Sequence, residues 1–392
     1  MKAGPWCLSV LAVAAAWSQN ESQVTRQGRS WVQTVSGSAS VEKSGKLRVA
    51  ARGEISLRGE ERSDVAYALT KRVRADSEQT ARRMLGQFVL ETVRRGIQTE
   101  FRLRLPPQDA EAQLRLRVPS GLREVVLVSR GGGLEAENLR GALQADTGGG
   151  HIRLDAIRGA VTVRTGGGNV RLGKIGGPVR CLVGGGSVTA EWLEQDADLA
   201  TAGGEIVVRR AEARLHLTTG GGNIRVERAR SVTAATGGGL IDVLEAEGPV
   251  VAEAAAGAVK VRAARGLRVR SGAGPIQLED VSGGLRATTG RGDIVAALAP
   301  VRALEESWLS TDAGDITVFI PSNLAVTIQA LNSQERLGRI LSDFPEIQPR
   351  REGSALQARG SLNGGGPLLR LAASGGTIYL KRSEGSGVSR PR

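Results

Sequence analysis

The chain has very few of the side chains that build metal sites and nucleophilic active sites. It holds 2 His and 2 Cys among 392 residues, so a zinc site or a Cys/His catalytic pair is disfavoured. Aromatic residues are also scarce, at 5 Trp, 4 Phe and 2 Tyr. Hydrophobic residues still make up 40% of the chain, which is more than a disordered chain carries. The sequence therefore predicts a core built from small aliphatic side chains.

The sequence also lacks an apolar run long enough to cross a bilayer as a helix, which takes about 20 residues. The apolar run from Trp6 to Ala16 follows Lys2 and ends in small residues. That arrangement is typical of a secretory signal, so residues 1–18 are predicted to be a signal peptide. Once Cys7 is removed with it, Cys181 has no partner for an intrachain disulfide. We expect an exported protein that is periplasmic, cell-surface or secreted, with no transmembrane segment.

Positive charge is in excess. Lys and Arg number 53 against 40 Asp and Glu, a formal net charge of +13. Such a balance favours anionic partners such as acidic polysaccharide, lipid head groups or nucleic acid. The basic residues are spread along the chain rather than clustered, so the excess also fits a surface that is simply soluble and self-repelling.

Glycine is abundant, at 54 residues, and much of it belongs to a repeat. A glycine triplet followed by alternating apolar residues recurs about every 18 residues. A period in this range indicates a stacked array. The clearest units are TGGGHIRL (147–154), TGGGNVRL (165–172), VGGGSVTA (183–190), TAGGEIVV (201–208), TGGGNIRV (219–226), TGGGLIDV (236–243), TGRGDIVA (289–296) and TDAGDITV (311–318).

Alternating residues within each unit predict two short strands that are buried on one face. Ile152, Val170 and Ile224 share the first inward column, and Val161 and Val179 share one in the second strand. No unit can bury its apolar face alone, so the units must stack. Ten or eleven coils about 4.8 Å apart make a rod roughly 50 Å long. The glycine triplet is assigned to a tight corner with left-handed backbone.

The fold class predicted is all-β: a stacked β-solenoid or β-helix of about 18-residue coils over residues 131–330. Two alternatives remain open. An 18-residue period equals three hexapeptides, as in a left-handed β-helix, although the inward residues do not recur every six positions. Antiparallel hairpins closed into a barrel would need polarity to invert between neighbouring units, and the columns show no inversion.

The flanks differ from the repeat. Residues 30–130 are predicted to form a small α+β cap at the N-terminal end of the stack, with one helix that starts near Asp76. Its apolar stripe is Met84, Leu85, Phe88, Val89 and Val93. Residues 331–382 are predicted to be a capping loop and a final repeat. Residues 383–392, rich in Gly, Ser and Arg, are predicted to be a disordered tail.

The order of these features resembles the bacterial "putative adhesin" β-strand-repeat family, an exported domain of unknown function. The resemblance rests on the turn at Val118-Pro119, on the T-G-G-G-x-[IV]-x-[LV] ladder, and on the end of the chain, where Ile320-Pro321 is followed by Gly364-Gly365-Gly366 and Ser374-Gly375-Gly376. It covers about residues 30–382. The family implies a repetitive exported β-protein and brings no catalytic motif.

A basic outward column is the candidate binding site. Arg153 and Arg171 occupy it in adjacent coils, with Arg225 further along. Such a column could bind an anionic polysaccharide or an envelope surface, or it could serve solubility alone. Nucleic acid is disfavoured, because almost no aromatic residues are interleaved with the basic ones.

Three aspartates near the end of the repeat are weaker candidates. Asp293 and Asp315 share a column in adjacent coils, and Asp312 lies close by. The pair has the residue type for a retaining glycosidase, and the three together for a Ca²⁺ site. The alternative is turn-forming Asp at a corner, where Asn169 and Asn223 already stand in other units. No catalytic residue, metal or cofactor is therefore predicted, and Cys181 is expected to be a buried small hydrophobe.

Taken together, the sequence predicts a non-catalytic exported or cell-envelope protein that acts as an adhesin or scaffold through its repetitive surface. A polysaccharide-cleaving β-helix enzyme and a signalling partner in envelope stress are the alternatives.

Overall fold

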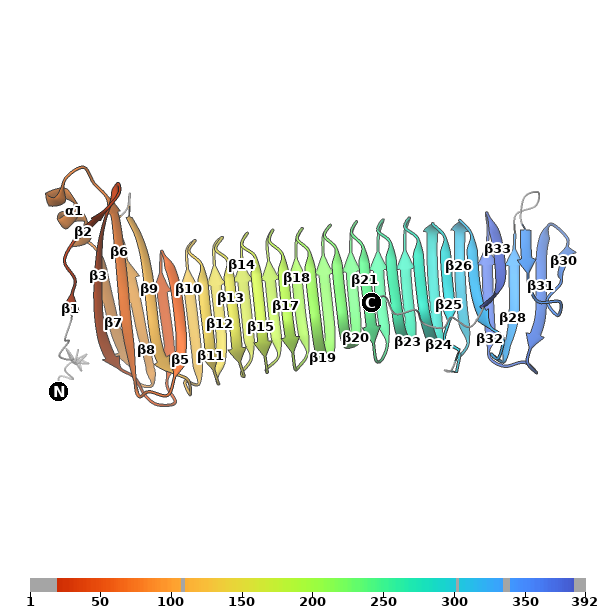
Figure 1. Ribbon diagram of the computed structural model, residues 1–392, viewed down its shortest axis with the longest axis horizontal. Coiled ribbons are helices and arrows are strands. Elements are labelled where there is room, and N and C mark those ends of the chain that lie inside the picture. The colour runs from red at the N-terminus through yellow and green to blue at the C-terminus, as the bar shows by residue number, and fades with distance from the viewer. Residues whose placement is uncertain (1–19, 107–109, 301–302, 334–338, 384–392) are drawn as a thin grey trace, which may run out of the picture.

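The computed structural model describes residues 20–383 except 107–109, 301–302 and 334–338. In this part of the chain it is a long rod of strands lying across the rod axis, with one helix at the N-terminal end (Figure 1). Residues 1–18, predicted as a signal peptide, and the tail after Ser383 lie outside the described residues. No helix among the described residues is both long and apolar enough to cross a membrane.

Each repeat unit contributes one strand to each of two layers. We call them layer A and layer B. Layer A contains β11 (Leu134–Leu139), β13 (Ile152–Ile157), β15 (Val170–Ile175), β17 (Val188–Leu193), β21 (Ile241–Ala246), β25 (Ile294–Leu298) and β27 (Ile316–Pro321). Layer B contains β10 (Glu124–Ser129), β12 (Ala142–Thr147), β14 (Val161–Thr165), β16 (Val179–Val183), β18 (Ala197–Thr201), β22 (Val250–Ala254) and β26 (Ser307–Ala313). Four long strands bend from layer A into layer B: β19 (Ile206–Thr219), β20 (Ile224–Thr236), β23 (Val259–Ser271) and β24 (Ile276–Arg291).

Neighbouring coils pair in parallel and in register, which confirms the predicted stack. Ile152 is the register partner of Val170 in layer A, and Val161 is that of Val179 in layer B. These inward columns are buried, with Ile152 and Val170 each 1% exposed. Parallel pairing throughout the repeat excludes the hairpin barrel, and two strands per coil exclude the three-sided hexapeptide helix.

The glycine triplets serve close approach between coils, and the predicted left-handed corner is wrong. Among the described glycines at the triplet corners of the repeat units, only Gly314 and Gly376 have a positive φ in the left-handed range, and the positive φ of Gly364 and Gly365 belongs to a turn outside these corners. A Cβ at Gly168 would lie 2.0 Å from the carbonyl oxygen of Gly150 in the preceding coil, whereas a Cβ at Gly167 would meet nothing within 4 Å. The stack therefore requires glycine at the third position, and the first glycine approaches as closely, since a Cβ at Gly166 would lie 2.1 Å from the carbonyl oxygen of Gly148.

A ladder of buried hydroxyls ties the same corners together. The Thr165 hydroxyl donates to the carbonyl of Gly150, one coil back, at 3.0 Å, and accepts from the N–H of Gly168 at 3.2 Å. Both contacts satisfy backbone groups that the bend leaves out of the strand pairing. The ladder explains the Thr or Ser before the triplet, and its members are Ser129, Thr147, Thr165, Thr201, Thr219, Thr236, Ser271, Thr289 and Thr311.

The N-terminal region extends the stack with strands out of chain order. β4 (Lys46–Ala51) and β5 (Glu54–Glu60) form a coil that pairs in parallel with β10 and β11 on one side. On the other side, the same coil pairs in parallel with β8 (Gln98–Arg104) and β9 (Ala110–Pro119). The first coil of the chain is thus held between two later ones. Antiparallel strands close this end: β6 (Asp64–Arg74), β3 (Ser30–Ser40), β7 (Val89–Arg95), β1 (Asn20–Glu21) and β2 (Thr25–Gln27).

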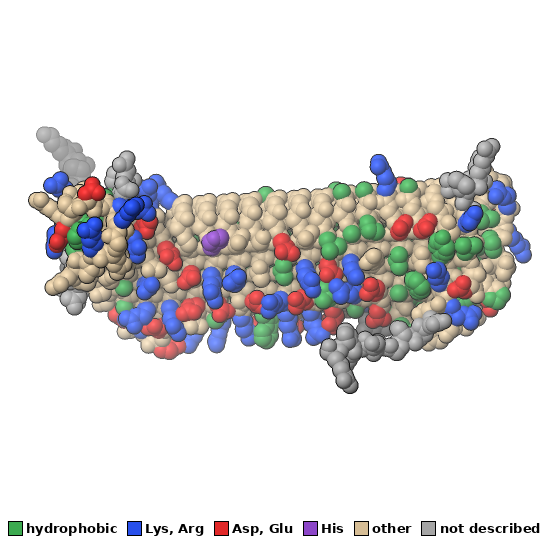
Figure 2. Space-filling view, turned by 45° about the horizontal axis from the view of Figure 1, so that its top comes forward, with side chains coloured by type: hydrophobic (Ala, Val, Ile, Leu, Met, Phe, Trp, Pro, Cys, Tyr) green, Lys and Arg blue, Asp and Glu red, His purple; other side chains and the backbone are tan. Residues whose placement is uncertain are grey.

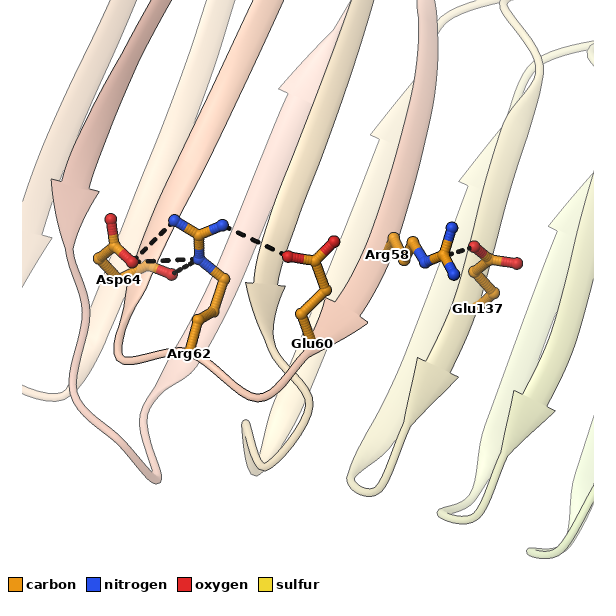
Figure 3. A network of polar contacts seen from close by, with 5 residues as sticks. All are labelled: Arg58, Glu60, Arg62, Asp64 and Glu137. Carbon is orange, nitrogen blue, oxygen red and sulfur yellow. Dashed lines mark hydrogen bonds and ion pairs between the residues drawn. The ribbon is translucent and has the colours of Figure 1, made fainter.

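Ion pairs bridge the out-of-order junction. Arg58 of β5 lies 3.2 Å from Glu137 of β11, as Figure 3 shows. At the turn into β6, Arg62 contacts Asp64 at 2.8 Å and Glu60 at 3.4 Å (Figure 3). Exposed pairs such as Arg58–Glu137 contribute about 0–1 kcal/mol, so the strand pairing and the buried apolar residues hold the junction.

The helix is shorter than its apolar stripe predicts. α1 (Glu78–Leu85) starts where expected, with the Ser77 hydroxyl accepting the N–H of Thr80 at 3.2 Å. It ends before Gly86, whereas Val89 and Val93 lie in β7, paired with β8. Glycine is a poor helix former, and β-branched residues favour strands. The predicted extension of the helix to Val93 is therefore wrong.

At the C-terminal end, too, one coil is inserted between two others out of chain order. β32 (Leu368–Ala373) lies between β26 and β28 (Val326–Asn332), and β33 (Thr377–Ser383) lies between β27 and β29 (Arg339–Ser342), all in parallel. The segment predicted as a capping loop thus contains strands, including the antiparallel β31 (Ala355–Leu362) and β30 (Pro349–Glu352). These added coils lengthen the rod to roughly 80 Å at about 4.8 Å per strand.

Candidate functional site

The predicted basic column is only partly contiguous. Arg153 and Arg171 are register partners on the outer face of layer A, but Thr189 and Val207 separate them from Arg225. Acidic residues flank both ends of the column. Glu135 is the register partner of Arg153, and Asp242 lies 4.0 Å from Arg225. The three arginines therefore do not form one continuous basic strip.

The carboxylates of the aspartate pair at the corner accept hydrogen bonds from the backbone. An Asp293 carboxylate oxygen accepts the backbone N–H of Asp315 at 2.8 Å, and Asp315 accepts that of Thr377 at 2.7 Å. Asn169 does the same for Ser187 at 3.0 Å. Each side chain thus satisfies the amide of the next coil at this bend. Asp312 is exposed, and among the described residues no group of three His, Cys, Asp or Glu is placed to hold a metal ion.

Cys181 is the buried small hydrophobe that the sequence predicts. It is 0% exposed and stands in the inward column of layer B between Val163 and Leu199. Burial, with a smaller contribution from Asp198, raises the pKa of the thiol to about 12. A thiol in this state is protonated at neutral pH and is not a nucleophile.

A shallow groove follows the rod axis along the glycine corner of layer B. Two depressions of about 730 and 700 Å³ lie in line along the rod. The last coil that lines the first depression is the direct neighbour of the first coil that lines the second. Buried threonines and corner glycines line it on one side, and an outward column of mixed small and charged residues lines it on the other. That column reads Val128, Asp146, Arg164, Leu182, Ala200, Thr218, Ala235, Glu253, Arg270 and Thr288.

The corner itself carries few charged or hydrophobic side chains over much of the rod (Figure 2). In Figure 2 it is visible as a tan strip along the upper edge, while charged side chains gather toward the lower edge. An open groove of this form suits a linear ligand more than a compact one, because it gives long contact but little enclosure.

Next to the groove, layer B carries a basic face that the sequence alone did not reveal. Arg268, Arg286, Trp308 and Arg370 are successive register partners on β23, β24, β26 and β32, and all four are exposed. We call these four residues the Arg–Trp face. The guanidinium carbon of Arg286 lies 5.6 Å from the centre of the Trp308 ring, and Trp308 is 41% exposed. Because Arg370 belongs to the out-of-order coil, sequence spacing could not place it beside Trp308.

The second exposed tryptophan of the rod has different surroundings. Trp192 lies between Lys174, 4.1 Å from its ring centre, and Arg210, 5.2 Å away. Both cations are already paired with acids, Lys174 with Glu194 at 3.1 Å and Arg210 with Glu212 at 2.5 Å. Within the described chain, Arg268 and Arg286 have no such acidic partner, whereas Arg370 lies 3.6 Å from the well-exposed Glu306.

Comparison with known proteins gives only distant structural similarities. No family model matches the sequence, and no curated protein matches it. A protein from Bacteroides fragilis described as a putative adhesin is 14% identical, with a TM-score of 0.28, covering 61% of this chain and 94% of its own. A putative lipid binding protein from Parabacteroides distasonis is 11% identical, with a TM-score of 0.30, covering 89% of this chain and 97% of its own.

A putative cell adhesion protein from Clostridium sporogenes is 8% identical, with a TM-score of 0.18, covering 94% of this chain and 100% of its own. Two of these three proteins are named for adhesion, as is the family that the sequence resembles. Each similarity is low in both identity and TM-score, so the function proposed below depends on this chain's own geometry.

Proposed function

We propose that this chain is a non-catalytic, adhesin-like surface protein that binds an anionic polymer along its rod. The observation that carries the proposal is the axial groove of layer B, open along consecutive coils and accompanied by outward arginines. Strands stacked in register place those side chains at a regular step of about 4.8 Å. A repeating polymer can meet such a surface at several points at once.

Charge supports an anionic partner. The formal net charge is +13, and the arginines of the Arg–Trp face are exposed on one side of the rod. A polyanion that contacts several cations releases its counterions, so its binding weakens steeply as salt is raised. Export to the periplasm, the cell surface or the exterior would bring the rod to the acidic polysaccharides of an envelope, and it is part of the same proposal.

The test is binding of the purified chain to immobilised anionic and neutral polysaccharides as salt is raised. We expect retention on the anionic polymer alone, with affinity falling linearly on a log–log plot against salt. Equal binding to the neutral polymer, or binding to the anionic one that does not change with salt, would contradict the proposal. Release of reducing ends from either polymer would instead favour the polysaccharide-cleaving enzyme.

A further inference from the structure

We propose that the Arg–Trp face is the binding site for an acidic polysaccharide chain, of the kind built from uronic acid sugars, laid along the rod axis. This inference rests on the proposed function and assigns it a location and a ligand class. Neither the repeat motif nor the predicted column of Arg153, Arg171 and Arg225 points to this face.

The tryptophan supplies the contact that favours a sugar. Trp308 stands on the flat outer face of a strand and is 41% exposed. Its ring offers apolar area to the C–H face of a pyranose, and its indole N–H is a donor for a sugar hydroxyl. Among the described residues no protein group accepts that N–H. Trp308 therefore offers an exposed ring edge and face and an indole N–H unpaired within the described chain, with the Arg286 guanidinium 5.6 Å from the ring centre.

The arginines supply the contact that favours acidic groups. Arg268 and Arg286 are adjacent in register and have no acidic partner in the described part of the chain. Two neighbouring guanidinium groups repel each other, and a carboxylate between them removes that repulsion. A guanidinium also presents a planar pair of N–H donors that matches a carboxylate. Arg370, on the far side of Trp308, adds a third cation whose contact with Glu306 is long, at 3.6 Å, and exposed.

The order of the residues matches a linear polymer. Cation, cation, aromatic ring and cation follow one another at steps of about 4.8 Å along the axis. A sugar stacked on Trp308 would place the neighbouring sugars of an extended chain over Arg286 on one side and Arg370 on the other. The groove runs alongside, and Arg270 and Thr288 line it next to the same coils.

Nucleic acid fits this face less well. Single-stranded nucleic acids are held by several aromatic side chains on which successive bases stack. The Arg–Trp face holds one aromatic ring among three arginines, and the register positions on either side of Trp308 are occupied by Arg286 and Arg370. The acidic polysaccharide needs only one stacking point and several cations.

The experiment compares binding of polygalacturonate, a neutral glucan and a single-stranded oligonucleotide to the full chain and its variants. We expect Trp308→Ala to weaken polygalacturonate binding about tenfold. We expect Arg268→Ala combined with Arg286→Ala to lower the log–log salt slope by roughly one to two. Two matched controls, Trp192→Ala and the pair Arg153→Ala with Arg171→Ala, should leave both quantities nearly unchanged.

The outcomes separate the two proposals. If polygalacturonate binds and the Trp308 and Arg268/Arg286 variants bind like the parent, this inference is overturned while the proposed function stands. If only the Arg153/Arg171 variant lost binding, this inference would also be overturned and the proposed function would stand, with the binding site on layer A. Binding of no anionic polymer at all would overturn the proposed function itself. Tighter binding of the oligonucleotide through Trp308 would replace the polysaccharide with nucleic acid. All substituted positions are exposed, so thermal unfolding should show each variant folded.

Discussion

At the scale of single residues, glycine separates into two roles within one triplet. The third position is glycine in every coil from Gly132 to Gly376, and a Cβ there would press on the preceding coil, as at Gly168 and Gly150. The middle position is open, and other units already place Ala256, Ala273 or Arg291 there. The repeat can therefore be recognised from sequence, but the reason for each glycine cannot, because close approach depends on the neighbouring coil.

This difference gives a prediction with a built-in control. We expect Gly168→Ala to lower the free energy of unfolding by about 1–3 kcal/mol, because the new methyl overlaps a backbone carbonyl that cannot move away cheaply. Gly167→Ala should change the same quantity by less than about 1 kcal/mol in either direction. Denaturant unfolding of both variants measures the difference. Equal effects at the two positions would show that corner flexibility, and not close approach, is what the triplet provides.

The side chains at the corner also show that the sequence predicts the position of a residue in the repeat but not its role. Asp293 and Asp315 share a column, as the sequence predicts, yet their carboxylates accept backbone amides of the next coil. Sequence could pair the two residues because the repeat gives their register. It could not tell a ligand from a structural acceptor, because that depends on where one N–H of a distant segment points, as Thr377 does toward Asp315.

At the scale of elements, both ends of the rod hold their terminal coil inside the stack. β4 and β5 lie between later coils, and β32 and β33 lie between earlier ones. This topology pairs both backbone edges of the first and last coils, so that neither is left at the end of the stack. The final repeat at β33 could be predicted from its local pattern, but the partners of these strands could not, because every coil presents a similar row of aliphatic residues.

We expect the C-terminal end of the rod to stay folded only when the inserted coil of β32 and β33 is present. A chain that stops at Gly365 lacks β32 and β33, so β29 loses its partner strand and β28 loses its parallel one. Buried aliphatic residues leave with them, namely Leu369, Leu371, Ile378 and Leu380, each worth about 1.5–3 kcal/mol. We expect hydrogen exchange protection to be lost from β28 to β31 but kept in the middle coils.

The control for this truncation is a chain that stops at Ser383, which keeps every described strand and should keep full protection. Persistent protection of β28 and β31 in the shorter chain would mean that the inserted coil is dispensable. Loss of protection along the whole rod would mean that the coils do not behave as the nearest-neighbour array that stacked repeats form.

At the scale of the whole molecule, the fold is a rod with a chemically different surface on each side. One layer carries a column in which arginines are interspersed with acids and uncharged residues, and the other carries the axial groove and the Arg–Trp face. The inward columns were predictable because burial imposes alternation on sequence. The complete Arg–Trp face was not, because Arg370 reaches Trp308 only through the inserted last coil, although Arg268, Arg286 and Trp308 lie on consecutive coils.

All of this depends on coils stacked in parallel with their repeat positions aligned, and engineered disulfides test that alignment directly. With both native cysteines replaced by Ala, Arg153→Cys with Arg171→Cys joins register partners on adjacent strands, about 4.8 Å apart and within the span of a disulfide. Arg153→Cys with Thr189→Cys skips one coil, at about twice that distance. We expect mild oxidation to close the first pair quantitatively within the monomer and to leave the second pair reduced. Closure of the second pair, or failure of the first, would contradict the stack.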